Sequence, residues 1–178
     1  MKIIGMIPAR LGSKRVPKKN LRLLNGRPLI SYNIETAVKS GVLDEVYVNS
    51  EAEIFSNIAK EYGAHFYKRP ENFSTDLANN DQFSFDFINN INGDILIQIL
   101  PTSPLLSIDD IKGFVSFMID NDFDTAVSTI SHNIAGVYQS NPINFEIFEP
   151  HISSQDMSPV ETYATVLMGW KYSNFKKN

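Results

Sequence analysis

Residues 2–20 decide the fold, and they read KIIGMIPARLGSKRVPKKN. Residues 2–7 are almost all apolar, which predicts a short strand buried in a sheet. The turn after this strand carries Gly12, Ser13 and a dense group of cations, although the formal net charge of the chain is −4. The cations are Arg10, Lys14, Arg15, Lys18 and Lys19. An apolar strand that ends in such a turn is typical of α/β proteins that hold phosphates at the carboxyl edge of the sheet.

The cationic turn has two interpretations. It lacks both common phosphate-binding patterns, G-x-x-x-x-G-K-[ST] and G-x-G-x-x-G, so we expect neither a P-loop nor a dinucleotide site. The turn could be a solvated basic loop, since charge runs are often solvated faces. Alternatively it binds an anion, with Gly12 letting the backbone approach a ligand and Ser13 adding a hydroxyl donor. Charge density alone leaves both interpretations open.

Strand-like and helix-like segments alternate along the rest of the chain, which favours a largely parallel sheet with helices on its faces. We therefore expect an α/β protein, a three-layer α/β/α fold with a mostly parallel, Rossmann-like sheet. The expected strands are residues 2–7, 45–49, 64–67, 95–100, 124–130 and 163–172. Helices are expected to begin at Pro28, at Ser50 (which has the S-x-x-E spacing of a capping box), after Asp81 and at Ser107. Residues 131–160 are rich in Asn, Ser and Pro and indicate no clear element.

Composition narrows the class of protein. At 178 residues the chain is most simply one domain, residues 1–178. The absence of cysteine excludes a disulfide framework, thiolate chemistry and a cysteine metal site. Without a long apolar run or a signal peptide, we expect a cytoplasmic protein with no membrane partner. A sequence pI near 5.3 argues against nucleic-acid binding, which leaves a small anion as the partner of the basic turn.

Five motifs follow one another in an order known from one family. They are IPARxGSK with KNL in Ile7–Leu21, LNGRPLI at Leu24–Ile30, VYVNS at Val46–Ser50, RPE at Arg69–Glu71 and PTSPL at Pro101–Leu105. In this order they resemble the acylneuraminate cytidylyltransferases, or CMP-sialic acid synthetases, of the nucleotide-diphospho-sugar transferase superfamily. The resemblance is good up to Asp110 and weak after it. It implies the fold of that superfamily and a CTP-dependent activity.

The resemblance also implies a nucleotide site. Arg10 and Lys19 would stabilise charge on the phosphates, and Lys14 would hold the β- and γ-phosphates and the departing pyrophosphate. These three cations are the expected catalytic residues. Asn20 offers an amide to the ribose or to a phosphate. The complete set of expected nucleotide-binding residues is Ala9, Arg10, Gly12, Ser13, Lys14, Lys19, Asn20, Arg69 and Asn80.

Two members of this set lie outside the basic turn. Arg69 could belong to a surface turn with a local ion pair to Glu71, which would contribute little stability. The family instead places Arg69 near the nucleotide base. Asn80 aligns with a family position that touches the cytosine.

The resemblance assigns Gln98, Thr102 and Ser103 to the sugar substrate. Taken alone, Pro101–Pro104 is simply a rigid turn before the next helix. Leu100 stands where the family often has Gln, and Gln98 lies two residues earlier on the same face of the strand. Either Gln98 takes that role from a deeper position or one substrate contact is missing.

The C-terminal part departs from the family pattern. Relatives carry a D-x-D pair that binds Mg²⁺ near their C-terminus, whereas the last aspartate here is Asp156. Mg²⁺ is therefore expected from the family, with no ligand identified in this chain. Either the chain is a truncated or naturally short version with weak or no activity, or another carboxylate, such as Asp109 or Asp110, holds the metal.

The resemblance implies a cytidylyltransferase that transfers CMP from CTP to an acidic nine-carbon sugar of the sialic acid type and releases pyrophosphate. One alternative is a non-catalytic CTP-binding relative without the C-terminal metal site. Another is a nucleotidyltransferase for a different sugar, such as 3-deoxy-manno-octulosonate or a sugar 1-phosphate. Relatives pair as dimers through a segment that follows the central sheet, so we expect a homodimer. Residues 135–160 could provide its interface or part of the substrate site.

Overall fold

The computed structural model describes residues 1–13, 16–75, 77–150 and 152–175. The chain divides into two compact units. Unit 1 comprises Met1–Ala126 and Val166–Asn178, and unit 2 comprises Val127–Thr165. The chain therefore leaves unit 1, forms unit 2 and returns to unit 1.

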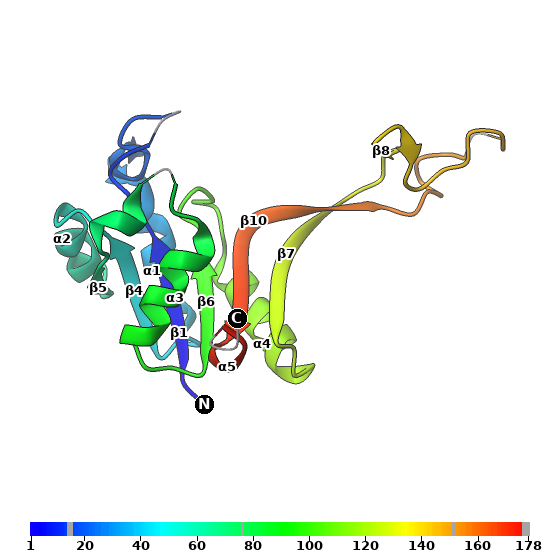
Figure 1. Cartoon of the computed structure of the whole chain (residues 1–178). Coiled ribbons are helices and arrows are strands. Elements are labelled where there is room, and N and C mark those ends of the chain that lie inside the picture. Colours follow the sequence, from blue (N-terminus) through cyan, green and yellow to red (C-terminus); the bar gives the residue numbers. More distant parts are fainter. Residues whose placement is uncertain (14–15, 76, 151, 176–178) are drawn as a thin grey trace. The chain divides into compact units, whose positions relative to one another are not determined.

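A mostly parallel sheet forms the centre of unit 1 (Figure 1). Within the described residues its strand order is β5 (His65–Lys68), β4 (Glu45–Ser50), β1 (Ile3–Pro8), β6 (Ile95–Ile99), β10 (Val160–Lys171) and β7 (Thr125–His132). Strand β1 pairs in parallel with β4 and with β6, and β4 pairs in parallel with β5. Strand β10 runs antiparallel to β6. This arrangement confirms the expected mostly parallel sheet.

Helices cover both faces of the sheet, which confirms the three-layer architecture. On one face, α1 (Leu29–Ser40), α2 (Ile54–Glu61) and α4 (Ile108–Asp120) pack on buried strand residues of one apolar cluster. On the other face, α3 (Asn80–Asn90) and α5 (Tyr172–Phe175) enclose Ile4, Met6 and Leu96. Successive residues of β1 and β6 thus point to opposite helix layers, as expected of strands buried on both faces.

The sequence predicted a capping serine at the start of α4 and a capping box at the start of α2, and only the first prediction is confirmed. Ser107 caps α4 in a capping box with Asp110, as expected. The prediction of a capping box at Ser50 is wrong. The Ser50 hydroxyl accepts a hydrogen bond from the Ala52 amide at 3.1 Å, and α2 begins only at Ile54. The Glu53 carboxylate forms an ion pair with Lys68 at 3.7 Å instead of turning back to Ser50. The Ser50 side chain thus closes a short turn with the backbone at a position where the sequence predicted the start of a helix.

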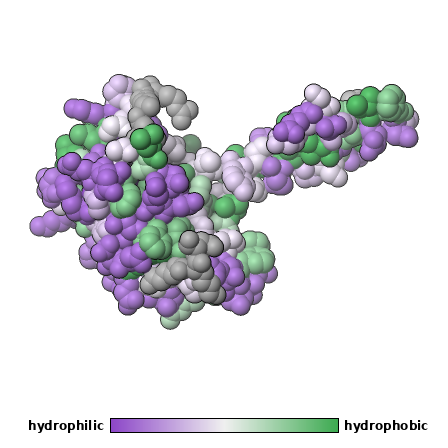
Figure 2. Space-filling view, in the orientation of Figure 1, coloured by the Kyte–Doolittle hydropathy of each residue, from purple (hydrophilic) through white to green (hydrophobic). Residues whose placement is uncertain are grey.

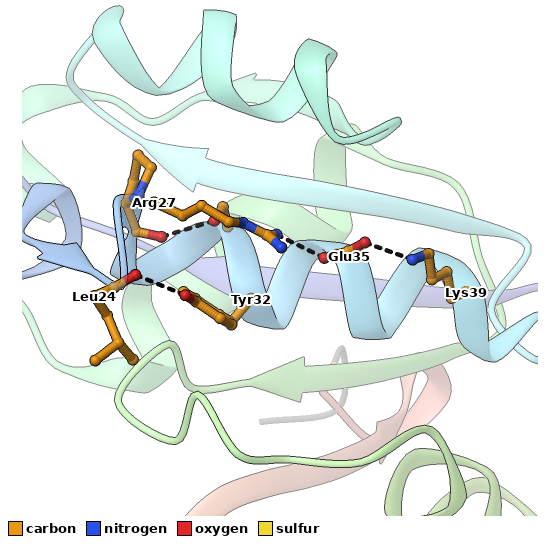
Figure 3. Close-up of polar contacts among 7 residues, drawn as sticks. Leu24, Arg27, Tyr32, Glu35 and Lys39 are labelled. Atoms are coloured by element: carbon orange, nitrogen blue, oxygen red, sulfur yellow. Dashed lines mark hydrogen bonds and ion pairs between the residues drawn. The ribbon is translucent and has the colours of Figure 1, made fainter.

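A small hairpin is fastened to α1 by charged and polar side chains. Strands β2 (Leu23–Leu24) and β3 (Arg27–Pro28) pair across a turn at Asn25 and Gly26, both of which have positive φ. Arg27 donates to Glu35 at 2.6 Å, and Lys39 also pairs with Glu35 (Figure 3). Tyr32 donates to the Leu24 carbonyl at 2.6 Å. These contacts hold the hairpin against α1.

Shorter elements complete the fold. Two 3₁₀ turns, η1 (Lys19–Leu21) and η2 (Glu71–Ser74), follow β1 and β5. The last two expected strands are observed at somewhat shifted bounds as β7 and β10. The hairpin of β8 (Val137–Tyr138) and β9 (Asn141–Pro142) lies in the region where the sequence indicated no clear element.

Unit 2 leaves many apolar side chains exposed. Figure 2 shows hydrophobic residues on its visible face. Among the described large apolar residues of unit 2, Phe148 is the most exposed, with 98% of its surface accessible. Others with more than half of their surface exposed are Ile134, Val137, Tyr138, Ile143, Ile147 and Tyr163. Among the described residues, no helix has the length and apolar character needed to cross a bilayer.

Candidate active site

A cavity of about 830 Å³ opens at the carboxyl end of β1 in unit 1. Its lining comes from five parts of the chain: the end of β1 with the segment after it, the 3₁₀ turn η1, the residue after β5, helix α3 and the loop after β6. The lining residues are Pro8, Ala9, Arg10, Ser13, Val16, Lys19, Asn20, Arg69, Phe83, Leu100, Pro101 and Thr102. The cavity therefore lies where ligands bind in open α/β sheets, beyond the carboxyl ends of the strands.

The first wall, which we call the cationic wall, comprises residues 8–13 and 19–20. Its backbone is tied to the neighbouring strand: Ala9 donates to the Asn49 carbonyl at 2.9 Å, and Leu11 donates to the Glu51 carboxylate at 2.7 Å. Both bonds hold the polypeptide at the point where it leaves β1. The wall thus presents Arg10 and Ser13 to the cavity from a fixed backbone.

The cationic wall continues through η1. Lys18, just before this turn, adopts a left-handed conformation with φ of 50°. Lys19 and Asn20 follow and both line the cavity. Asn20 is 6% exposed, and its Oδ1 accepts no hydrogen bond within the part of the chain that the structure describes. A buried amide oxygen of this kind is suited to accept a ligand hydroxyl, because an unsatisfied buried acceptor carries a desolvation penalty.

Arg69 brings a further cation to the cavity from the end of β5. It is 3% exposed and donates from Nε to the Asn49 side chain and from Nη2 to the Asn49 carbonyl, both at 2.7 Å. Its guanidinium lies 4.3 Å from the centre of the Phe83 ring. Burial lowers the pKa of Arg69 to about 10. The surface-turn interpretation is therefore wrong for Arg69, which is a buried and firmly held cation.

The opposite wall, which we call the hydroxyl wall, comprises Leu100, Pro101 and Thr102. Its start is tied to β10, since Leu100 donates to the Val166 carbonyl at 2.9 Å. The Ser103 carbonyl accepts from the Leu106 amide at 3.1 Å and from Asn33 Nδ2 at 2.9 Å. Ser103 itself follows the lining segment and is not a lining residue.

Gln98 and Asn80 lie together but away from this lining. Gln98 Nε2 donates to Asn80 Oδ1 at 2.7 Å, and the Ser84 hydroxyl lies 3.4 Å from Gln98 Oε1. Gln98 is 1% exposed on the face of β6 that α3 covers. The pair thus joins a residue expected at the base to one expected at the sugar, within a single buried network.

Two other expected nucleotide-binding residues have a different outcome. Gly12 is exposed, and a Cβ atom added there would meet no atom within 4 Å, so the structure gives no steric reason for glycine. Lys14 lies outside the described residues. The remaining expected residues of the set, Ala9, Arg10, Ser13, Lys19, Asn20 and Arg69, do line the cavity.

The acidic and histidine side chains of the described residues do not gather into a metal-binding cluster. Among residues 1–13, 16–75, 77–150 and 152–175, no group of three or more His, Asp or Glu side chains could hold one. Asp110, one of the carboxylates considered, accepts from the Ser107 amide at 2.9 Å and from the Ser107 hydroxyl at 2.7 Å. These bonds hold the pKa of Asp110 below its usual range. Asp110 therefore serves as part of the helix cap.

Several site residues were not anticipated from the sequence. Phe83 and Val16 contribute apolar lining, and Asn49, Glu51 and Asn33 hold lining segments from behind. Asn49 and Glu51 lie in or beside the VYVNS motif, so that motif carried a signal for them. Asn33 stands in an ordinary amphipathic helix, and no local pattern distinguishes it.

Known proteins place this fold and site in context. The cytidylyltransferase family profile matches residues 4–157. A pseudaminic acid cytidylyltransferase from Campylobacter jejuni is 34% identical over 173 residues, covering 92% of this chain and 75% of the relative. An N-acylneuraminate cytidylyltransferase from Streptococcus agalactiae is 35% identical over 133 residues, covering 72% of this chain but only 32% of that protein.

A solved structure agrees at the level of the fold. The CMP:2-keto-3-deoxy-manno-octonic acid synthetase, solved in complex with CTP, superposes with a TM-score of 0.77. The alignment covers 99% of this chain and 77% of that one, with 17% sequence identity. From the profile match over most of its length, supported by these relatives, the chain belongs to the cytidylyltransferase family.

Proposed function

We propose that the chain transfers CMP from CTP to a nonulosonic acid of the sialic acid type and releases pyrophosphate. One observation carries the proposal: a single cavity at the carboxyl edge of a parallel sheet has cations on one wall and a hydroxyl on the other. The two relatives described above are named for pseudaminic acid and N-acylneuraminate, and a further relative from Legionella pneumophila is named a CMP-N,N'-diacetyllegionaminic acid synthase.

The chemistry that this cavity has to support is a displacement at phosphorus. The anomeric hydroxyl oxygen of the acid sugar forms a bond to the α-phosphorus of CTP, and the bond from that phosphorus to the bridging oxygen breaks. Pyrophosphate leaves with the electron pair, and the hydroxyl loses its proton. Because such a transfer needs little covalent help, catalysis consists mainly of positioning and charge stabilisation.

The residues divide these tasks according to their positions. Arg10 and Lys19 lie on the cationic wall, where they would neutralise the phosphate oxygens, and Lys14 is proposed to join them at the β- and γ-phosphates. Arg69 supplies a buried cation that does not need to move, since Asn49 already fixes it. Thr102 would face the acceptor sugar. Asn80 and Gln98 would act from the buried network behind this lining.

The test combines binding with turnover. Calorimetric titration with CTP, and with ATP, GTP and UTP as controls, measures nucleotide selectivity. Pyrophosphate release is then measured with N-acetylneuraminic, pseudaminic and legionaminic acids, with and without Mg²⁺. Selective CTP binding with release that depends on the acid sugar supports the proposal. Absence of nucleotide binding by an intact fold would reject it.

A second function is favoured by one observation. The described residues lack a cluster of metal donors, so a CTP-binding protein without catalysis fits the same cavity. This candidate predicts CTP binding with no pyrophosphate release under any condition above. Transfer to 3-deoxy-manno-octulosonate is the less favoured alternative, because Thr102–Leu105 resembles the sialic acid type of the family, and the resemblance implies a Gly-Asp-x-Pro pattern for lipopolysaccharide relatives.

We also propose that the chain is a homodimer and that residues 135–160 contribute to the interface. The support is the exposed apolar surface of unit 2, which is unusual for a surface facing only water. Light scattering after gel filtration should give twice the monomer mass. Replacing the fully exposed Phe148 with Asp should shift the mass toward the monomer, and an unchanged dimer would move the interface elsewhere.

A further inference from the structure

Asn33 is an unexpected side chain for its position. It lies in α1 on the face that packs onto the sheet, next to the buried Ile30, Ile34 and Ala37, and is 1% exposed. Asparagine is a poor residue for a helix interior, because its amide competes with the helical backbone for hydrogen bonds. A buried amide is also unfavourable unless it is paired. Helix stability therefore does not explain this residue.

The contact that Asn33 makes lies 70 residues away in the sequence. Its Nδ2 donates at 2.9 Å to the Ser103 carbonyl, the same oxygen that accepts the Leu106 amide in a tight turn. With Leu100 fixed to Val166, the loop is tied on both sides of a two-residue segment. That segment is Pro101–Thr102, which lines the cavity, whereas Asn33 does not.

The cationic wall is held by other residues. Its backbone is held by the bonds from Ala9 to Asn49 and from Leu11 to Glu51, and neither of these bonds involves α1. Loss of the Asn33 bond should consequently loosen the hydroxyl wall and leave the phosphate side in place. The two walls can thus be perturbed separately.

We propose that Asn33 is a positioning residue for the acceptor sugar. It holds Pro101 and Thr102 so that the acceptor hydroxyl lies in line with the α-phosphorus, and it does so from behind the wall without touching substrate. The proposal rests on the proposed function, in which CTP occupies the cationic side of the cavity and the acid sugar the hydroxyl side.

The main variant is Asn33→Leu, which keeps side-chain volume and the apolar packing of α1 but removes the donor. The matched control is Ser40→Ala. Ser40 is also buried on α1, but its hydroxyl bonds within the helix, to the Ala37 carbonyl at 2.7 Å. Both variants remove one hydrogen bond that a buried side chain of α1 donates, and only Asn33→Leu releases the loop.

For Asn33→Leu we expect the KM for the acid sugar to rise about tenfold, the effect of losing one ordinary hydrogen bond that fixes a reacting group. The KM and the calorimetric Kd for CTP should stay within about twofold of wild type, as should all constants of Ser40→Ala. A parallel rise in both KM values, or an unchanged KM for the acid sugar, would overturn the proposal.

Hydrogen exchange tests the same inference without turnover. In Asn33→Leu the Leu106 and Leu100 amides should exchange faster, while the Ala9 and Leu11 amides keep wild-type protection. Uniform acceleration at all four amides, or none, would reject the positioning role. Because this readout needs no substrate, it separates failure of the Asn33 proposal from failure of the proposed function.

Discussion

The two walls of the cavity differ in what they carry and in what holds them. The cationic wall carries Arg10 and Lys19 and is tied to the end of β4. The hydroxyl wall carries Thr102 and no charged residue. It is held by hydrogen bonds to β10 on one side and to Asn33 of α1 on the other. If the proposed function holds, charge stabilisation and acceptor placement belong to separate parts of one sheet edge. Substitutions should therefore separate the two tasks.

The largest effect is expected at Arg10. Arg10→Ala should lower the rate of pyrophosphate release by about 10²–10³-fold, because it removes a preorganised cation from the developing negative charge. The melting temperature should hardly change. Arg22→Ala is the matched control, since Arg22 is an exposed arginine outside the cavity lining. Unchanged turnover in Arg10→Ala would remove Arg10 from the mechanism.

A smaller effect is expected where Glu51 ties the cationic wall. Glu51→Ala removes the acceptor of the Leu11 amide, so the wall should loosen and CTP affinity should fall about tenfold. Glu51→Gln keeps an acceptor oxygen and should recover part of the loss. Calorimetry measures both, with the exposed neighbour Glu53→Ala as control. If CTP bound more tightly to the alanine variant, repulsion by the carboxylate would outweigh its tie to the backbone.

The hydroxyl wall should respond more weakly and toward the other substrate. Thr102→Val keeps the shape of the side chain and removes its hydroxyl. We expect a rise of about threefold to tenfold in the KM for the acid sugar, the range of a single neutral hydrogen bond, with CTP binding unchanged. Steady-state kinetics with each substrate varied in turn provide the measurement. A selective loss of CTP affinity would reverse the assignment of the two walls.

The smallest effect concerns α1 outside both walls. Lys39 and then Arg27 hold the pKa of Glu35 below its ordinary value of 4.5 (Figure 3). A lowered folded-state pKa adds stability that is present above the unfolded-state pKa and is lost as the pH falls through the folded-state pKa. Glu35→Gln should thus flatten the acid limb of the stability curve below pH 4.5, as measured by urea unfolding. If the stability of Glu35→Gln fell as steeply with pH as that of wild type, the acid-induced loss of stability would come from other carboxylates.

The fold was largely predictable because its strongest signals are local. Runs such as Ile95–Ile99 are apolar at every position but one, as expected of strands covered on both faces, and Ser107 stands at the start of its helix with Asp110 at the right spacing. The S-x-x-E pattern at Ser50 failed because a serine hydroxyl can stabilise a turn as readily as a helix start. The backbone conformation after the serine decides between a turn and a helix start, and the S-x-x-E spacing does not specify it.

The candidate site was predictable in part. The basic turn and Thr102 reach one cavity because carboxyl ends of parallel strands meet at one edge. The contacts behind the lining were not predictable: Asn49 with Arg69, Asn80 with Gln98 and Asn33 with Ser103 join residues 18 to 70 positions apart. Long-range hydrogen bonds made by single asparagine and glutamine side chains leave no spacing, charge or period in the sequence.

The order of the strands has a consequence for engineering the molecule. Unit 2 departs from β7 and returns through β10, and these two strands are neighbours in the sheet (Figure 1). It is thus an insertion whose two junctions, after Ala126 and before Val166, fall on adjacent strands. Replacing it with a short turn, or with the corresponding insertion of a relative, would make a chimera that retains the Leu100–Val166 tie and every residue lining the cavity. Unit 2 can thus be exchanged to test the proposed dimer interface while the cavity of unit 1 keeps its sequence.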